Sequence, residues 1–274
     1  MDFRSTCLRV STRLAIAAVW LLSVSCRESV TDPRPWVLDW SDEFDGPAGA
    51  LPNATTWRFD VGTDWGNQQL EFDTDRATNA SLDGSGHLVI TARREPYQGR
   101  AFTSARITTA GKRQFQYGRI EARMQLPRGR GLWPAFWLLG DNFRTVGWPA
   151  SGEIDIMEYR GQEPSRVLGT VHGPGYFGGG GITGDTTLRN VRFDNSFHVF
   201  AIEWSASQIE WFVDGQRYHS VRREDVPGPW VFDRPFHMIL NVAVGGTFLG
   251  APDQFTPFPT AMVVDWVRVY RLPP

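Results

Sequence analysis

Three acidic residues within six positions, Glu153, Asp155 and Glu158, are the part of this sequence best suited to chemistry. Side chains alternate across a β-strand, so Glu153 and Asp155 would share one face. Strict alternation would place Glu158 on the opposite face. A one-residue bulge at Ile156-Met157 would return it to the same side. The spacing therefore predicts three carboxyl groups on one patch of a sheet.

Glycoside hydrolysis is a reaction that needs such a patch. One carboxylate attacks the anomeric carbon and a second carboxyl group protonates the leaving oxygen; a separation of about 5–5.5 Å leads to retention through a covalent intermediate. Glu153 and Glu158 are the expected pair, and Asp155 between them would orient the nucleophile and share a proton in a coupled titration. A solvated acidic strand face, or oxygen ligands for a divalent ion, would show the same spacing.

Composition limits the class of protein. The chain has 274 residues, 41% of them hydrophobic, which suits one large sandwich or barrel, or two small domains. A net charge of -2 argues against nucleic-acid binding and against an electrostatic membrane surface. Twelve Trp and eighteen Phe can fill a core or form platforms for the apolar faces of sugar rings, and 28 Gly with 18 Pro indicate the many turns of an all-β fold.

The amino terminus reads as a targeting segment, outside the folded domain. A basic start precedes the apolar stretch 14–22, which is too short to span a bilayer comfortably. The pattern ending at Cys26 resembles a bacterial lipoprotein signal, although Ser23 stands where such signals prefer Leu. We expect a lipoprotein-type signal peptide over residues 1–26, a tether over 27–35, and export to the cell envelope. Ordinary secretion and an uncleaved anchor are the alternatives.

Alternating hydrophobicity dominates the rest of the chain, and convincing helical periodicity is absent. Residues 118–126 and 198–204 read as strands, and Asp214-Gly215 is a two-residue hairpin signal. Many short strands without a linker or repeats predict a two-sheet antiparallel sandwich, as a single domain over 36–274. The glycine run 178–181 lacks a following Lys and reads as a mobile loop near a cleft, not a phosphate cradle.

Several motifs together resemble glycoside hydrolase family 16, and within it the bacterial laminarinase-type endo-β-1,3-glucanases. The residues that carry the resemblance are 40–46 (WSDEFDG), 131–137 (GLWPAFW), 148–149 (WP), 152–158 (GEIDIME) and 264–270 (VDWVRVY). The E-x-D-x-x-E form, with the extra Met157, is the bulged version typical of laminarinases. The resemblance implies a concanavalin-like β-jelly roll of two antiparallel sheets, with a substrate cleft on the concave face.

The resemblance also implies catalytic roles. Glu153 matches the nucleophile, Asp155 the assisting acid and Glu158 the general acid/base. The pKa of Glu158 must then be raised by burial or by neighbouring charge, so that this group starts protonated near neutral pH. No cofactor is expected for catalysis.

Further residues are candidates for sugar binding. Trp133, Trp137, Trp148 and Asn67 match sugar-binding positions of the family. Arg106 could point into the cleft, and His172, on the strand after the catalytic one, could bond the nucleophile region or sugar. Trp133 and Trp137, four residues apart, would share one strand face. The alternatives are core packing for each Trp, a surface ion pair for Arg106 and a structural role for His172. Laminarinases usually carry an acid where Gln69 stands. The remaining tryptophans considered, namely Trp57, Trp204, Trp211 and Trp266, are expected in the core.

A structural Ca²⁺ is the one metal ion that the resemblance implies. Its ligands would be oxygens from Glu43, the Gly86 carbonyl and Asp265, since hard oxygen donors suit calcium. Asp265, in an otherwise apolar strand, would be costly to bury unpaired. Cys7 precedes the apolar stretch, so a mature chain would contain no disulfide and a metal ion could add stability.

The sequence thus predicts a retaining endo-β-1,3-glucanase acting on laminarin-like or mixed β-1,3/1,4-glucan. The alternatives are a hydrolase acting on another polysaccharide such as a galactan, a transglycosylase, and a non-catalytic glucan-binding protein, whose mark would be loss of the catalytic glutamates. The expected partner is the polysaccharide. The protein is expected to be monomeric, and to meet a membrane only through lipid at Cys26.

Overall fold

The computed structural model describes residues 35–273. The signal segment, its Cys26 and residues 27–34 of the tether lie outside the described residues. Between residues 35 and 273 the helical elements are one short helix, α1 (Phe143–Val146), and two 3₁₀ turns, η1 (Gly178–Gly180) and η2 (Arg223–Asp225). None of these is long and apolar enough to cross a membrane.

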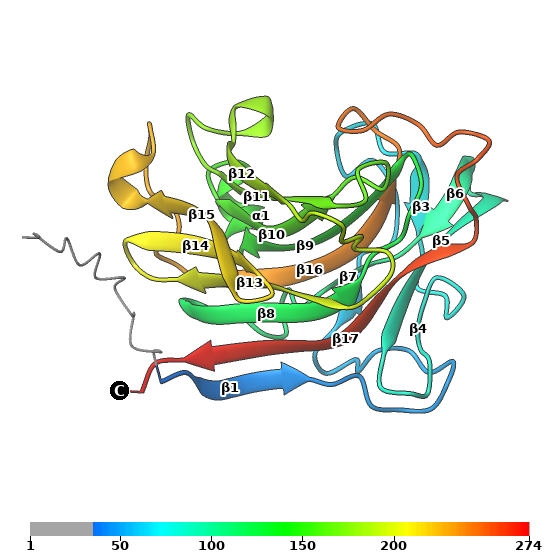
Figure 1. Ribbon diagram of the computed structural model, residues 1–274, viewed down its shortest axis with the longest axis horizontal. Coiled ribbons are helices and arrows are strands. Elements are labelled where there is room, and N and C mark those ends of the chain that lie inside the picture. The colour runs from blue at the N-terminus through cyan, green and yellow to red at the C-terminus, as the bar shows by residue number, and fades with distance from the viewer. Residues whose placement is uncertain (1–34, 274) are drawn as a thin grey trace, which may run out of the picture. The chain divides into compact units, whose positions relative to one another are not determined.

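Two β-sheets make up this part of the chain, and Figure 1 shows their strands in two layers. In spatial order the ten-stranded sheet contains β15 (Gln216–Arg222), β14 (Gln208–Val213), β13 (His198–Trp204), β8 (Gly118–Gln125), β17 (Thr260–Arg271), β5 (Leu88–Tyr97), β6 (Arg100–Ser104) and β3 (Glu71–Asp73), with β1 (Val37–Asp42) beside β17 and β4 (Ala80–Leu82) beside β5. The seven-stranded sheet contains β12 (Ile182–Thr187), β11 (Arg166–His172), β10 (Glu153–Tyr159), β9 (Leu132–Gly140), β16 (Phe236–Val244), β7 (Arg106–Thr108) and β2 (Arg58–Phe59).

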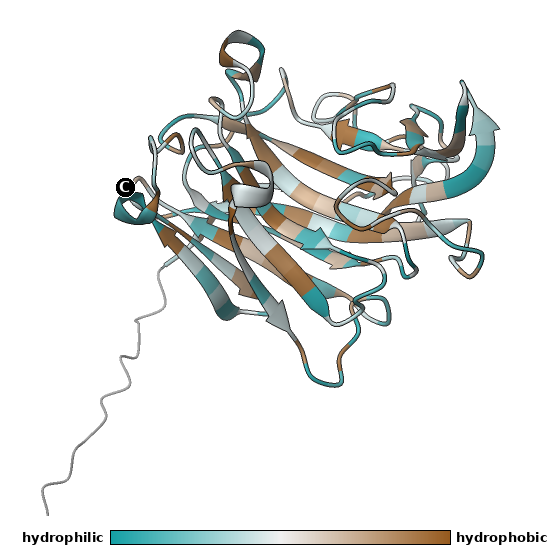
Figure 2. Cartoon of the chain, turned by 90° about the horizontal axis from the view of Figure 1, so that it is seen from above, coloured by the Kyte–Doolittle hydropathy of each residue, from teal (hydrophilic) through white to brown (hydrophobic). Residues whose placement is uncertain are grey.

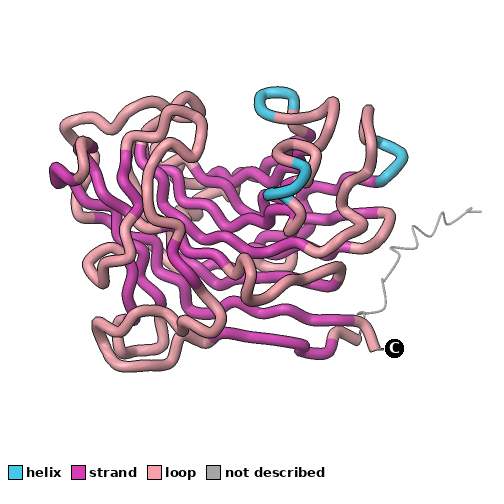
Figure 3. Tube along the Cα trace, turned by 180° about the vertical axis from the view of Figure 1, so that it is seen from behind, coloured by secondary structure: helices cyan, strands magenta, loops and turns pink. Residues whose placement is uncertain are grey.

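The predicted all-β sandwich of two sheets is confirmed. Neighbouring strands pair antiparallel, with β3 and β6 as a parallel exception. Figure 3 shows the strands crossing the body of the domain, with the loops gathered at their ends. Such an arrangement puts two sheet faces against each other and leaves loops to shape the outer face.

Alternation along the strands builds the core between the sheets. In β8, Ile120, Ala122 and Met124 are fully buried, as the sequence pattern predicts. Hydrophobic residues (brown) lie along the strands in Figure 2, interleaved with polar ones. β16 is buried along its whole length, because one face belongs to the main core and the other lies under the side chains of Trp133 and Trp137.

The predicted hairpin at Asp214-Gly215 joins β14 to β15. Both residues have positive φ, 49° and 78°, as a two-residue turn that matches the strand twist requires. The Asp214 carboxylate also accepts a hydrogen bond from the main-chain N–H of Val199 at 2.9 Å. The turn fixes the register of β14, whose Trp211 contacts the candidate site.

Candidate active site

A bulge in β10 places the three acidic residues on one side of the strand. The register of β10 shifts between Asp155 and Met157 against β9, and between Asp155 and Glu158 against β11. Ile156 and Met157 are both buried in the core between the sheets. Glu158 therefore returns to the face that carries Glu153 and Asp155, and the predicted bulge is confirmed.

Trp211 stabilises the bulge from the other sheet. A bulge disrupts the hydrogen-bond ladder and leaves main-chain groups to be satisfied by other partners. The indole N–H of Trp211, a fully buried residue of β14, donates to the carbonyl oxygen of Asp155 at 2.8 Å. The sequence predicts Trp211 only as a core residue, since nothing in the spacing links it to β10.

The carboxyl groups have a shared environment. The indole N–H of Trp133 donates to Glu158 Oε1 at 3.1 Å, and the Thr170 hydroxyl to Glu158 Oε2 at 3.4 Å. His172 Nε2 lies 3.2 Å from Asp155 Oδ2 and 3.7 Å from Glu153 Oε1. β9 and β11, the two neighbours of β10, thus supply the donors that hold the acids in place.

Burial changes the acid–base properties of this group. The pKa of Glu153, Asp155 and Glu158 is in each case raised to about 8, with burial as the largest cause. For Glu153 and Glu158 the charge of Asp155 contributes to this rise and His172 opposes it. The side chain of Glu153 keeps 19% of its surface exposed, whereas that of Asp155 keeps 5%. The cluster can therefore hold protons near neutral pH, and Glu153 remains accessible to a substrate.

Trp133 and Trp137, both on β9, point to the same side, as predicted. Trp137 is half-buried and its indole N–H donates to Asn241 Oδ1 at 2.8 Å. Trp133 is more enclosed: it is 9% exposed, packs on Phe248 with ring centroids 4.7 Å apart, and is bonded to Glu158. Trp133 thus contacts a candidate catalytic carboxyl group, that of Glu158, directly.

Arg106, at the start of β7, lies on the Trp137 side of the site. Its guanidinium stacks between the rings of Trp137 and Trp65, at 4.8 and 5.0 Å from their centroids. It also forms an ion pair with Asp60 at 3.2 Å, and its side chain is only 13% exposed. Sequence reasoning missed Trp65, and its place two residues before Asn67 is the signal that could have found it.

Asn67 lies in the exposed loop before β3. Its φ is 53°, and its carbonyl oxygen accepts the main-chain N–H of Thr247 at 2.8 Å. A Cβ on Gly246 would come within 2.7 Å of that oxygen, so the glycine is needed for this close approach. The contact fixes the loop of Asn67 to the loop after β16.

His172, at the end of β11, joins the acids to two loops. Its ring lies 5.9 Å from that of Trp148 between centroids. A Cβ on Gly181 would come within 2.4 Å of the His172 ring, so the end of the glycine run packs directly on it. The expected position of this run near the site is confirmed. Ligand atoms of Glu153, Asp155 and His172 lie within 4.8 Å of one another and could hold a metal ion.

The carboxylates predicted to bind Ca²⁺ are paired with arginine side chains. Both carboxylate oxygens of Glu43 accept from Arg268, at 3.0 and 2.9 Å. Asp265 is paired with Arg123, so the expected cost of burying it unpaired does not arise. The carbonyl oxygen of Glu43 lies 3.8 Å from where a Gly86 Cβ would be. The main-chain oxygens of Glu43 and Gly86 and the Asp265 carboxylate are of the donor type that Ca²⁺ prefers, and the site stays a prediction.

The core assignment of the other tryptophans is right for three of four. Trp57, Trp204 and Trp211 are buried in the main core. Trp266 is only half-buried, and the guanidinium of Arg268 stacks 4.2 Å from its ring centroid. The core prediction for Trp266 is wrong because the register of β17 shifts between Val264 and Trp266, which the alternation pattern does not reveal.

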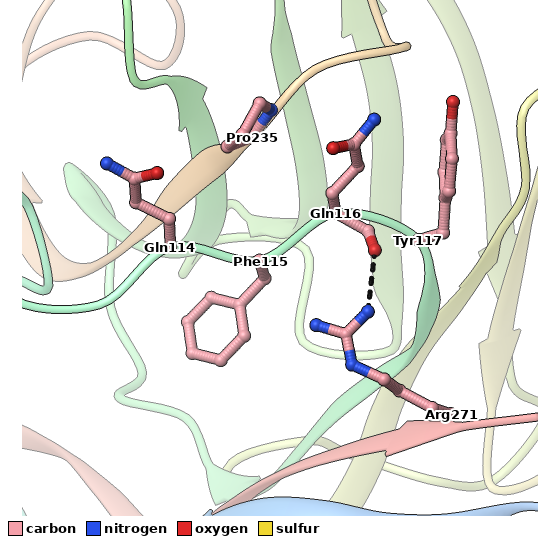
Figure 4. A pocket seen from close by; sticks show the side chains of 6 residues that line it. All are labelled: Gln114, Phe115, Gln116, Tyr117, Pro235 and Arg271. Atoms are coloured by element: carbon pink, nitrogen blue, oxygen red, sulfur yellow. Dashed lines mark hydrogen bonds between the residues drawn. The ribbon is translucent and has the colours of Figure 1, made fainter.

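A separate pocket of about 470 Å³ lies before β8. Figure 4 shows its lining residues, with the Arg271 guanidinium donating to the Gln116 carbonyl at 2.9 Å. Phe115, one of the lining residues, forms an isolated β-bridge with Phe236 at the start of β16. No acidic side chain lines this pocket, so the carboxyl cluster of β10 remains the candidate for catalysis.

A two-sheet β-sandwich with three carboxyl groups on one strand face is the arrangement expected of a glycosidase. The model of glycosyl hydrolases family 16 matches residues 59–268, and the chain belongs to this family. It is 45% identical over 253 residues to a β-glucanase of Rhodothermus marinus, covering 88% of this chain and 87% of that protein. It is 44% identical over 239 residues to a glucan endo-1,3-beta-glucosidase of Cryptopygus antarcticus, covering 81% and 85%. The solved endo-beta-1,3-glucanase structure from Pyrococcus furiosus matches with a TM-score of 0.84 and 48% identity, covering 88% and 97%.

Proposed function

We propose that this protein is a retaining endo-β-1,3-glucanase that cleaves laminarin-like glucan by double displacement. The observation that carries the proposal is the bulge in β10, which brings Glu153 and Glu158 to one face with Asp155 between them. The substrate class is supported by the named activities of the relatives from Rhodothermus marinus, Cryptopygus antarcticus and Pyrococcus furiosus.

In the first step the Glu153 carboxylate attacks the anomeric carbon and forms a glycosyl ester. The bond from that carbon to the glycosidic oxygen breaks, and Glu158 gives its proton to this oxygen. Burial raises the pKa of Glu153, Asp155 and Glu158 each to about 8, so the three carboxyl groups hold protons as a set near neutral pH. The step starts from the state in which Glu158 carries a proton and Glu153, beside His172, is charged. The hydrogen bonds from Trp133 and Thr170 hold its two oxygens in position.

In the second step Glu158, now a carboxylate, takes a proton from water. The water oxygen attacks the anomeric carbon, the ester bond breaks, and the Glu153 carboxylate is restored. Two inversions at one carbon retain its configuration. Asp155 and His172, which lie within 3.2 Å of each other, orient Glu153 and adjust the charge around it as it changes between ester and carboxylate.

The same site is compatible with another reaction and with other substrates. If a sugar hydroxyl took the place of water, the protein would be a transglycosylase. If the loops around the site accepted other chains, the substrate would be mixed β-1,3/1,4-glucan or a galactan. A purely binding protein is disfavoured, because both glutamates are present and placed with donors around them.

Export and calcium belong to the same proposal. The pattern over residues 1–26 supports a lipid anchor at Cys26 and surface digestion of polysaccharide. A Ca²⁺ ion held by Glu43, Gly86 and Asp265 would tie the start of the domain to β17 and add stability, without a role in the reaction.

Product analysis tests the proposal. The protein is incubated with laminarin, lichenan, cellulose, agarose and carrageenan, and Glu153→Gln is the control. Short β-1,3-gluco-oligosaccharides from laminarin, absent with the variant, are the expected result. Cleavage of a galactan alone would overturn the substrate and keep the mechanism. Laminarin binding without any cleavage would favour the binding protein.

A further inference from the structure

Two exposed aromatic side chains meet beside the active site. Trp148, between α1 and β10, is 41% exposed, and Phe177, in the loop after β11, is 47% exposed. Their ring centroids lie 5.4 Å apart at an interplanar angle of 82°. Exposed aromatic side chains that touch form a larger apolar surface than either ring alone, and such a surface next to a site indicates a ligand contact.

The loop of Phe177 is anchored on both sides. Before it, Tyr176 is buried and its hydroxyl donates to the Pro229 carbonyl at 2.8 Å. After it, Gly181 packs on the His172 ring. Between these anchors, a Cβ on any of the residues 178–180 would have no atom within 4 Å. Phe177 thus stands between two anchored residues, at the base of an open glycine tip.

His172 connects this aromatic pair to the catalytic acids. Its Nε2 lies 3.2 Å from Asp155 and 3.7 Å from Glu153, while its ring is 5.9 Å from that of Trp148. A chain of contacts therefore runs from the nucleophile through His172 and Trp148 to Phe177. The pair lies on the Glu153 end of β10, opposite the Trp133–Phe248 contact at the Glu158 end.

We propose that Phe177 extends the sugar-binding position that the family resemblance implies at Trp148, and that it binds a glucosyl unit of the polysaccharide away from the bond that is cleaved. The proposal rests on the proposed function, because it takes the ligand to be the same glucan. The apolar C–H face of a sugar ring suits an uncharged aromatic surface, and the site is continuous with the catalytic acids. Phe177 then sets the preference for long over short chains.

Kinetics on substrates of different length test this role. Phe177→Ala should raise the KM for laminarin about fivefold to tenfold, the loss expected for one aromatic contact. The kcat should stay unchanged, as should kcat/KM on short chromogenic glucosides that do not reach Phe177. Phe177→Tyr should restore the KM, whereas Phe177→Leu, which is apolar but not flat, should not. Leu51→Ala is the matched control: Leu51 is equally exposed, at 47%, in the connection between β1 and β2.

The outcomes separate this inference from the proposed function. An unchanged KM of Phe177→Ala on laminarin, with the wild-type protein active, would overturn only the inference. The inference would also be overturned if the wild-type protein formed a concentration-dependent dimer that Phe177→Ala abolishes without a change in KM. Phe177 and Trp148 would then contact a second copy of the chain. A wild-type protein that does not cleave laminarin would contradict the proposed function itself, whatever the variants do.

Discussion

Two strands of this domain carry closely spaced acidic residues, and only one of the two groups is placed for catalysis. Glu153, Asp155 and Glu158 lie on β10, while Glu71 and Asp73 lie on β3. Burial raises the pKa in both groups: to about 8 for the three on β10, to about 7 for Glu71, and well above its usual range for Asp73. A raised pKa alone therefore does not distinguish a catalytic group from a structural one.

The partners of the β3 pair explain its different role. Glu71 is 1% exposed, and its carboxylate accepts the main-chain N–H of Val244 at 2.8 Å, at the end of β16. Asp73 is 2% exposed and accepts the indole N–H of Trp65 at 2.9 Å. These bonds hold the loop of Trp65 and the end of β16 together. No substrate can reach carboxyl groups enclosed to this extent.

Access and position separate the two groups. Glu153 keeps part of its surface exposed and lies near the ring nitrogen of His172, so its charge can change when a substrate binds. In the β3 pair, Glu71 Oε2 and Asp73 Oδ2 accept hydrogen bonds from fixed donors. The same isosteric exchange of Glu for Gln should therefore abolish activity at Glu153 but change mainly the stability at Glu71.

The largest effect is expected for Glu153→Gln. The amide has nearly the shape of the carboxylate but cannot attack the anomeric carbon, so activity on laminarin should fall by more than about 10⁴-fold. The fold and the binding of oligosaccharide should be retained, as calorimetry and thermal unfolding can check. Substantial remaining activity would remove Glu153 from the role of nucleophile.

Glu158→Gln should divide substrates by their leaving groups. Loss of the proton donor should lower kcat on laminarin by about 10²–10⁴-fold. A dinitrophenyl glycoside, whose leaving group needs no proton, should still react in the first step, seen as a burst of phenolate. Equal losses on both substrates would show that Glu158 is not the acid.

Much of this arrangement could be predicted from local patterns. Alternation defined strands such as β8 and β13, and the Asp214-Gly215 signal gave the hairpin, because both depend on nearest neighbours along the chain. The E-x-D-x-x-E spacing alone predicted the bulge in β10. A two-residue side-chain period leaves no other way to bring Glu158 onto the face of Glu153.

Contacts between distant segments could not be predicted in this way. The bond from Trp211 to β10 joins residues 56 positions apart, and the Arg106 stack joins three separate segments. Arg268 pairs with Glu43 across 225 positions, which changes how a calcium ion would be held. Such contacts depend on which strands become neighbours, and a single sequence gives no direct sign of that.

Trp211→Phe should lower activity less than the loss of either glutamate. The Asp155 carbonyl at the bulge would lose its donor, at a cost of about 1–3 kcal/mol, and the acids of β10 would be held less firmly. We expect about a tenfold lower kcat and an altered pH profile. Trp204→Phe is the matched control, because its buried indole N–H also donates to a main-chain carbonyl, that of Phe232 at 2.9 Å. Similar stability loss with equal kinetics in both variants would assign Trp211 to packing alone.

The smallest effect on activity is expected for Glu71→Gln, which should change stability instead. In the folded state the pKa of Glu71 is raised from 4.5 to about 7 by burial, so the folded protein holds this proton more tightly than the unfolded chain. The resulting stability is fully present below pH 4.5 and is lost as the pH rises through 7, on the order of 3 kcal/mol in all. Gln cannot ionise, so urea unfolding at pH 5 and pH 8 should show the variant gaining on the wild type at the higher pH. The raised carboxyls of β10 are common to both proteins and cancel in this difference. If Glu71→Gln also lowered kcat on laminarin, the β3 pair would take part in the reaction. The distinction between a catalytic group on β10 and a structural group on β3 would then be wrong.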